Sequence, residues 1–494
     1  MNSAIRFFDS IHELFGKNER GSERMRLFFW LSGLFIALNA LFLYQENFTL
    51  LLVPASLLIL ILAFFKTEIV FFAVVAFTPL SVNIRDIGMG FGISLPGEPL
   101  IMLLLGVFIL KLLLEGSFDR KIIMHPISIL ILLHLLWIGI TAVSSSMPSV
   151  SFKFLLSRLW FVGVFYFMAT QIFANKEKRK PFLLAYIWTL AIVILYTTWK
   201  HSHYGFDEKI AHWIMDPFFN DHTAYAAAIA MFLPALFWFA IEKESPNWQK
   251  GLNFFLLALF LLGIVLSYTR AAWVSLAGAV GVMTLFLLRI KFRTILLVGA
   301  TLLSLFLVFQ TQIFLKLERN RQDSSKDFSR HLQSISNIST DASNLERINR
   351  WHSALRMFKE HPILGFGPGT YQFQYAPFQH SSELTIISTN SGTKGTAHSE
   401  FLGPMAEQGI LGVILFSMII GLVLWRAAFV YTNTEGSDKY FALVLILGLV
   451  TYFVHAFLNN FLDSDKASVP FWGFIALITA LDLQIASKTL PTKP

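Results

Sequence analysis

Residues 399–426 read SEFLGPMAEQGILGVILFSMIIGLVLWR. This stretch is long enough to cross a bilayer, because about 20 apolar residues in a helix span the hydrocarbon core. It carries one carboxylate in its interior, Glu407, two turns from its start. A carboxylate at that depth is costly and marks a functional or pairing site by default. We therefore interpret the stretch as a membrane helix whose carboxylate has a functional or pairing role.

The composition extends this interpretation to the whole chain. Of the 494 residues, 55% are hydrophobic and only 14% are charged. Soluble domains have about a quarter charged residues, so a soluble body and a disordered chain are both excluded. We predict an all-α polytopic membrane protein with about 14 (12–14) transmembrane helices. The apolar segments run near 27–44, 48–65, 68–83, 99–115, 126–146, 155–174, 182–198, 222–241, 251–268, 271–288, 293–310, 399–426, 439–457 and 468–486.

The basic side chains predict the orientation. With fourteen helices, alternate loops hold most of the Lys and Arg, and the positive-inside rule assigns those loops to the cytoplasm. Both termini are then cytoplasmic, and the net charge of +8 needs no nucleic-acid partner. The basic residues of these loops are Arg20, Arg24, Arg26, Lys66, Arg120, Lys121, Lys176, Lys178, Arg179, Lys180, Lys243, Lys250, Arg289, Lys291, Arg293, Arg426, Lys488 and Lys493.

Four parts make up the expected organisation. Residues 1–26 contain a cytoplasmic amphipathic helix suited to the inner-leaflet interface, with a partner-binding helix as the alternative. Residues 27–310 contain transmembrane helices 1–11. Residues 311–397 form a large outer loop with short helices, and residues 398–494 contain helices 12–14. The absence of cysteine excludes disulfides, thiolate metal sites and a cysteine nucleophile.

The outer loop holds a helix with two arginines. Apolar residues recur at helical spacing from Leu345 to Phe358, and His361-Pro362 ends the pattern. Arg347 and Arg350 share one face of this helix. That face is either simply solvated or a clamp for phosphate, whose oxygens match the forked guanidinium geometry. The glycine-rich stretch 365–369 follows, and its backbone can approach a ligand closely.

His398 stands where this loop meets the next membrane helix. A helix N-terminus disfavours imidazolium, and a neutral imidazole is what a general base needs. The alternative is a histidine that merely caps the helix. Tyr371 and Tyr375 follow the glycine loop and either stack on sugar rings or pack the loop itself.

Further polar groups are expected at the outer face. Arg270 lies between two closely spaced helices, and Arg158 lies about one turn inside its helix, where it either snorkels or faces a cavity. Asp221-His222 is a supporting pair. A metal site formed by this pair with His201, His203 or His212 is a minor alternative, because no short ligand motif is present. We expect the triplet 463–465, Asp-Ser-Asp, to be a solvated loop.

Three blocks of sequence resemble the O-antigen ligase and polysaccharide polymerase superfamily of bacterial membrane glycosyltransferases. The first block is 266–272, LSYTRAA, and the second runs from Glu346-Arg347 to the glycines at 365–369. The third comprises AHSEF at 397–401 and AEQG at 406–409. Ser399 departs from the family pattern, which usually has asparagine there. The segment 219–222 also looks like a family element, and the resemblance covers roughly residues 200–420.

The resemblance implies a fold of the GT-C type in the bacterial inner membrane, with the active site facing the periplasm. It implies a donor glycan carried on undecaprenyl diphosphate, an acceptor glycolipid, glycan or protein, surrounding membrane lipid, and no metal or cofactor. Arg270, Arg347, Arg350 and Arg158 would bind the diphosphate, and His398 would act as the base or orient the acceptor. Glu407, His222, Asp221 and Tyr371 would support the site.

Three functions stay open. A ligase transfers the glycan to a lipid or protein hydroxyl, whereas a repeat-unit polymerase transfers it to another lipid-linked unit. A transporter or flippase of lipid-linked sugars would show charges along a membrane path and internal symmetry. A structural scaffold would not bring Arg270, Arg347, Arg350 and His398 together.

Overall fold

The structure is a computed structural model that describes residues 19–84, 93–116, 118–290, 342–385, 388 and 395–489. Helices form almost all of it, and a two-stranded antiparallel ribbon, β1 (Val82–Ile84) with β2 (Ile93–Leu95), pairs Asn83 with Ser94. The α-helices are α2 (Glu19–Tyr44), α3 (Leu52–Phe65), α4 (Thr67–Phe77), α5 (Gly97–Glu115), α6 (Arg120–Ile123), α7 (Pro126–Val143), α8 (Pro148–Val162), α9 (Ala169–Phe173), α10 (Arg179–Ser202), α11 (His222–Ile241), α12 (Asn247–Leu266), α13 (Arg270–Leu287), α16 (Ala342–Glu360), α17 (Tyr371–Gln374), α18 (Leu402–Thr432), α19 (Gly436–Leu458) and α20 (Asp465–Thr489).

Eleven helices of the described residues are long and apolar enough to cross a membrane, which makes the chain an all-α polytopic membrane protein. The number rises to twelve if the pair Thr49–Phe65 and Thr67–Leu80, bent by 117° at Lys66, is one span. The predicted segment 293–310 and the predicted interfacial helix before Glu19 lie outside the described residues. All other predicted segments fall on described helices, and the total of fourteen stays a prediction.

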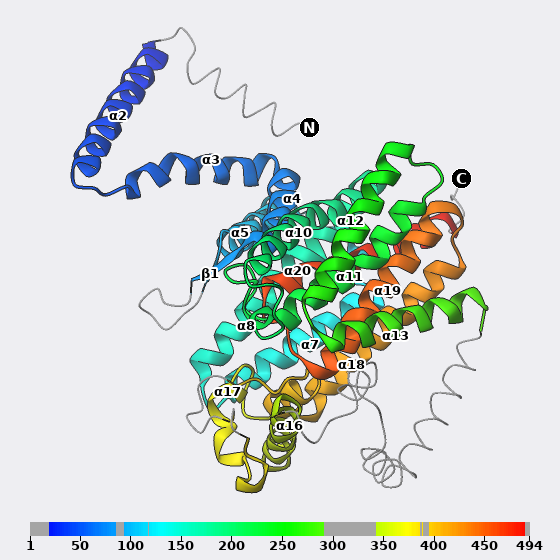
Figure 1. Ribbon diagram of the computed structural model, residues 1–494. Helices are drawn as coiled ribbons and strands as arrows, with labels where there is room; N and C mark the ends of the chain where they lie inside the picture. The colour runs from blue at the N-terminus through cyan, green and yellow to red at the C-terminus, as the bar shows by residue number, and fades with distance from the viewer. Residues whose placement is uncertain are drawn as a thin grey trace, which may run out of the picture.

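Helices α11, α19 and α20 form the centre of the bundle. Most of their residues are buried, as expected for α11, whose alanines let neighbouring helices approach closely. Tyr186 of α10 stacks on Phe232 of α11 with ring centroids 4.5 Å apart. By contrast, α2 and α3 project from the bundle in Figure 1, and most of their leucines are exposed, as are Phe28 and Phe29. These exposed apolar faces are suited to lipid.

One long span contains a π-helical turn. Residues Gly163–Met168 join α8 to α9, and the whole element runs from Pro148 to Phe173. A π-turn holds more residues than an α-turn, so it changes the directions in which the two halves of the helix present side chains. Figure 1 places α16 and α17 at one end of the bundle, beneath α18 and beside the start of α8.

The helix predicted in the outer loop is confirmed as α16. It ends at Glu360, directly before His361-Pro362. Short turns follow it: α17, Ala376–Phe378 and Ser381–Glu383. The other parts of the predicted loop, 311–341 and most of 386–394, lie outside the described residues, so its full extent stays a prediction.

Candidate functional site

A cavity of about 680 Å³ opens at the end of the bundle that carries α16 and α17. We call it the outer cavity. It lies between the ends of several membrane helices and α16, and a site of this size accommodates a large ligand. Six of the predicted site residues line it: Arg158, Asp221, Arg350, Tyr371, His398 and Glu407.

Arg350 is buried on the cavity side of α16. Its Nε donates to Glu346 Oε1 at 2.7 Å, and its Nη1 donates to the Thr396 carbonyl at 3.2 Å. Its guanidinium also lies 5.1 Å from the centre of the Tyr375 ring. Burial acts to raise the pKa of Glu346, but hydrogen bonds from Ser388 and Arg350 outweigh it and lower that pKa. Glu346 is therefore ionised and fixes the orientation of the arginine.

Gly395 makes room for this arginine. A Cβ at residue 395 would overlap the guanidinium of Arg350, so any other residue there would displace this guanidinium from its present position. The next residue supplies the carbonyl that Arg350 binds. The short segment before His398 thus positions Arg350 in two ways. The Thr396 carbonyl accepts a hydrogen bond from it, and Gly395 leaves space for its guanidinium.

His398 lies beside Arg350 in the lining of the outer cavity. Its backbone has a positive φ of 47°, and Trp351 Nε1 donates to its carbonyl at 3.5 Å. Burial, and then the positive charges of Arg350 and Arg347, lower the pKa of the imidazole from 6.5 to about 4. The ring is therefore neutral at pH 7 and able to accept a proton.

The structure corrects the expected place of His398 at a helix N-terminus. α18 begins at Leu402, four residues later, and Ser399 Oγ accepts the Phe401 and Leu402 amides at 3.2 and 3.3 Å. The residue that departs from the family pattern therefore binds two amides at the start of the helix. His398 owes its neutrality to burial and arginine charge, and the helix dipole is not needed.

Arg347, Arg270 and His222 do not line the outer cavity. Arg347 is partly buried on α16, close enough for its charge to act on His398. Arg270 is exposed at the first residue of α13, as its position between two helices predicts. The preceding Thr269 donates its hydroxyl to the His222 carbonyl at 3.3 Å, so this corner adjoins the cavity at Asp221.

Asp221 starts α11 and is a helix cap. Its carboxylate accepts the Thr223 amide at 2.7 Å and lies 3.1 Å from His222 Nδ1. Burial acts to raise its pKa, but hydrogen bonds from His222 and Thr223 lower it to about 2. His212 Nδ1 also lies 3.3 Å from His222 Nδ1. Within the described residues, no group of three or more histidines and carboxylates is arranged to hold a metal.

Arg158 faces the cavity, the second of the two predicted alternatives. It donates to the Leu462 carbonyl at 3.1 Å and to Asp463 at 3.0 Å. Glu400, which we did not predict as a site residue, accepts the amides of residues 461 and 462 at 2.7 and 2.8 Å. Burial raises the pKa of Glu400. Both side chains thus hold the loop that precedes α20 against the cavity.

Glu407 joins the second and third blocks of the family resemblance. Its carboxylate accepts the Gly369 and Tyr371 amides, each at 2.9 Å. The Gly367 amide donates to the Glu407 carbonyl at 2.8 Å, and the Phe366 amide donates to Ala406 at 3.1 Å. We call this contact between residues 362–371 and 406–410 the glycine clamp.

The glycine clamp corrects the predicted use of the glycines. Gly365 has a φ of 66°, and a Cβ there would overlap the Glu407 backbone. Gly409 has a φ of 69° inside α18, and a Cβ there would overlap the Ile363 carbonyl. Gly365, which we expected near a ligand, therefore approaches the backbone of its own chain, as does Gly409, whereas Gly369 lines the outer cavity.

Tyr371 and Tyr375 are buried and stack on each other with centroids 5.3 Å apart. The Tyr371 hydroxyl donates to the Arg350 carbonyl at 2.8 Å. The loop-packing alternative is thus the one observed, and Tyr371 supports α16 from within.

The triplet at 463–465 is solvated only in part: Asp463 is exposed, whereas Asp465 is buried. Asp465 is 2% exposed and accepts from the Ser81 hydroxyl at 2.5 Å. Lys466 donates to the Thr78 and Ser81 carbonyls, each at 2.8 Å. The prediction was wrong for Asp465 because its partner Ser81 lies 384 residues earlier in the chain.

Residues 255–417 match the family model described as O-antigen ligase. This range contains the three blocks of the resemblance, so the predicted superfamily is confirmed over that part of the chain. No curated protein matches the chain.

Proposed function

We propose that the protein transfers a glycan from undecaprenyl diphosphate to an acceptor hydroxyl at the outer face of the bacterial inner membrane, because residues 255–417 match the family model described as O-antigen ligase. The observation that carries the proposal is the pairing of a neutral, buried His398 with a fixed Arg350 in one cavity.

The reaction breaks the bond between the anomeric carbon and the diphosphate oxygen, and the bonding electrons leave with the diphosphate. The acceptor oxygen forms the new bond and loses its proton to His398. A neutral imidazole suits this step because it accepts a proton at pH 7. No cofactor takes part in the proposal.

Arg350 would stabilise the charge that develops on the leaving diphosphate. Its position is fixed in advance by Glu346 and Thr396, which use Nε and Nη1. Nη2 has no hydrogen-bond partner in the described part of the chain and stays available to a phosphate oxygen. Preorganised charge in a poorly hydrated site is worth more than the same charge in water.

Arg270, Arg347 and Arg158 complete the proposed diphosphate site. Arg158 lines the cavity but also holds residues 462 and 463, so its role is partly structural. Arg347 acts on His398 through its charge. Arg270 adjoins the cavity through Thr269 and His222, where it would contact a donor that enters from the side of α13.

The proposal is tested with purified protein and an undecaprenyl diphosphate-linked glycan. Lipid A core, a protein and a second lipid-linked unit are supplied separately, and released carrier diphosphate is measured. Release with lipid or protein acceptors indicates a ligase, and release with the second unit alone indicates a repeat-unit polymerase. Release with none of them, while the glycan crosses a vesicle membrane, would favour a transporter.

Variants identify the site. We expect His398→Ala, Arg350→Ala and Arg270→Ala to lower transfer by at least about a hundredfold, the scale at which one acid–base or charge-stabilising group acts. Arg350→Lys keeps the positive charge but loses the forked geometry of the guanidinium. His380→Ala, at an exposed histidine in the turns after α16, is the matched control and should retain activity. Full activity in His398→Ala would remove this histidine from the mechanism.

A further inference from the structure

A second cavity lies at the opposite ends of α4 and α5 from the outer cavity. Ser81, which follows α4, and Glu98, at the start of α5, line the outer cavity. The start of α4 and the end of α5 line the second cavity, together with part of α9. We call this second cavity the inner pocket. Its volume of about 170 Å³ far exceeds the 10–15 Å³ that one water needs by the same measure.

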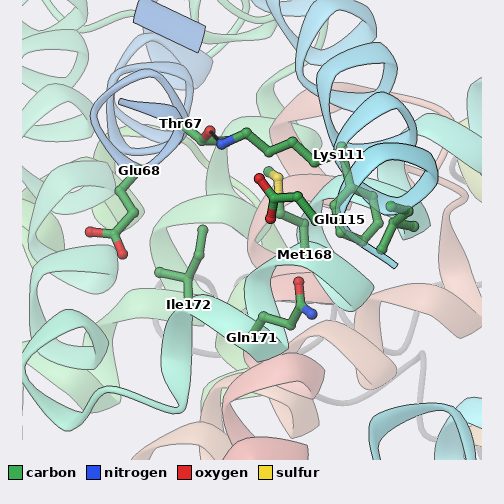
Figure 2. Close-up of a pocket in the computed structure, with 9 residues that line it drawn as sticks. Thr67, Glu68, Lys111, Glu115, Met168, Gln171 and Ile172 are labelled. Carbon is green, nitrogen blue, oxygen red and sulfur yellow. Dashed lines mark hydrogen bonds between the residues drawn. The ribbon is translucent and has the colours of Figure 1, made fainter. Parts of the chain in front are cut away.

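One ammonium and two carboxylates line the inner pocket, as Figure 2 shows. Lys111 donates to the Thr67 hydroxyl at 2.7 Å and lies 5.6 Å from the centre of the Phe64 ring. Thr67 uses one of the three hydrogens of this ammonium, so two remain for a ligand. Glu68 also lines the pocket, but its carboxylate pairs with Lys178 at 2.7 Å.

Glu115 is the carboxylate that is left for a ligand. It lies one helical turn beyond Lys111 on α5, and in Figure 2 its carboxylate points into the pocket. It has no ion pair or hydrogen bond to any of the residues that the structure describes. Glu115 is exposed, and its charge acts on Lys111 one turn away. A ligand that binds both side chains would place an anionic group on Lys111 and a cationic donor on Glu115.

The surroundings of the inner pocket favour a lipid as the source of this ligand. Phe108, Leu112, Met168 and Ile172 complete the lining. α3 packs against α4 and α5, the helices that line the pocket, and exposes a run of apolar residues between Leu52 and Ile61. An apolar surface beside a polar pocket at the end of two membrane helices matches a phospholipid, whose acyl chains lie along helices and whose headgroup lies at their ends.

We propose that the inner pocket binds the phosphoethanolamine headgroup of phosphatidylethanolamine, with its phosphate on Lys111 and its ammonium on Glu115. A phosphatidylglycerol headgroup has no cation and would leave Glu115 unmatched. A phosphatidylcholine headgroup has a cation without N–H donors and cannot hydrogen-bond to Glu115. The headgroup would also stabilise the bend between α3 and α4. Thr67 is the first residue of α4 after this bend, and its hydroxyl accepts a hydrogen bond from Lys111.

The test uses the full chain in detergent micelles and measures its midpoint of thermal unfolding with equal amounts of the three phospholipids. We expect phosphatidylethanolamine to raise the midpoint by several degrees more than the other two lipids. Native mass spectrometry should show a retained phosphatidylethanolamine. Equal stabilisation by all three lipids would overturn the proposal.

Variants separate the pocket from general lipid effects. Glu115→Gln should abolish the preference for phosphatidylethanolamine, and Lys111→Met should weaken the response to this lipid. Glu435→Gln, at an exposed carboxylate that makes no side-chain cap, is the control and should keep the preference. A preference unchanged in Glu115→Gln would overturn the assignment.

A water-soluble headgroup distinguishes the two sources of this chemistry. Glycerophosphoethanolamine should stabilise the protein much less than the lipid, because it lacks acyl chains. Equal stabilisation would assign the pocket to a free phosphoethanolamine compound and overturn the lipid assignment. None of these measurements depends on glycan transfer.

Discussion

At the scale of single residues, the chemistry of His398 depends on its environment. Burial and two arginines hold the pKa of its imidazole at about 4. Below this pKa the ring is protonated and cannot accept a proton from the acceptor. An unperturbed histidine would lose that ability near pH 6.5.

We predict that transfer stays active down to about pH 4–5, well below the usual histidine pKa. Arg347→Gln removes one of the charges that disfavour imidazolium, so the acid limb should move to higher pH. The measurement is the initial rate of carrier release between pH 4 and 8. An acid limb near pH 6.5 in the unmodified protein would contradict the assignment of His398 as a buried base.

Gly395→Ala should abolish transfer almost as fully as Arg350→Ala, because the new methyl group takes the place of the guanidinium. Gly421→Ala is the matched control, since no atom lies within 4 Å of a Cβ there. Both variants are compared for carrier release and for normal insertion. Wild-type activity in Gly395→Ala would show that the guanidinium does not need its present position.

Sequence analysis found residues whose chemistry is local and missed those whose partners are distant. Arg350 and His398 stand in recognisable blocks, and the outer cavity contains both. Glu400 stands in the same block, but its partners at 461 and 462 became visible only in the fold. Arg270 also stands in a recognisable block, yet its side chain does not line the outer cavity.

At the scale of elements, the glycine clamp fixes α16 and its loop to the start of α18. Hydropathy located α18 because a membrane-spanning helix is recognised by the length of its apolar run. It could not show the non-helical conformation at Gly409, because one residue hardly changes the average of a window. Helical periodicity likewise predicted α16, whereas the short turns after it carry no comparable pattern.

We expect Gly409→Ala to destabilise the protein by about 1–3 kcal/mol, the cost of forcing a side chain into a conformation that favours glycine. The overlap with the Ile363 carbonyl adds to this cost. Thermal unfolding in detergent measures the effect, with Gly421→Ala as the control. An unchanged unfolding midpoint in Gly409→Ala would mean that the clamp contributes little.

At the scale of the whole molecule, the orientation rests on the basic loops and on the number of crossings. If α3 and α4 form two spans or a re-entrant pair, α2 keeps the orientation that the sequence predicts. If they form one broken span, α2 is reversed. The bend of 117° at Lys66 makes this a question for experiment.

The chain has no cysteine, so each introduced cysteine gives a unique label. We predict that a membrane-impermeant maleimide labels His380→Cys in spheroplasts, whose outer membrane is removed and whose inner membrane is closed. Glu177→Cys and Glu23→Cys should react only after permeabilisation. Labelling of Glu23→Cys from outside would indicate one broken span, and reversed labelling of the other two would contradict the proposed orientation.

The π-helical turn at Gly163–Met168 has a consequence for how this protein can change over generations. The same span presents Arg158 to the outer cavity and Gln171 to the inner pocket. Each residue turns an α-helix by about 100°. Deletion of a single residue between these two positions would therefore rotate one end of the span by about 100°. Arg158 or Gln171 would then no longer face its cavity, whereas most substitutions there would change only packing. Lineages that keep both cavities should vary in sequence along this stretch but not in its length.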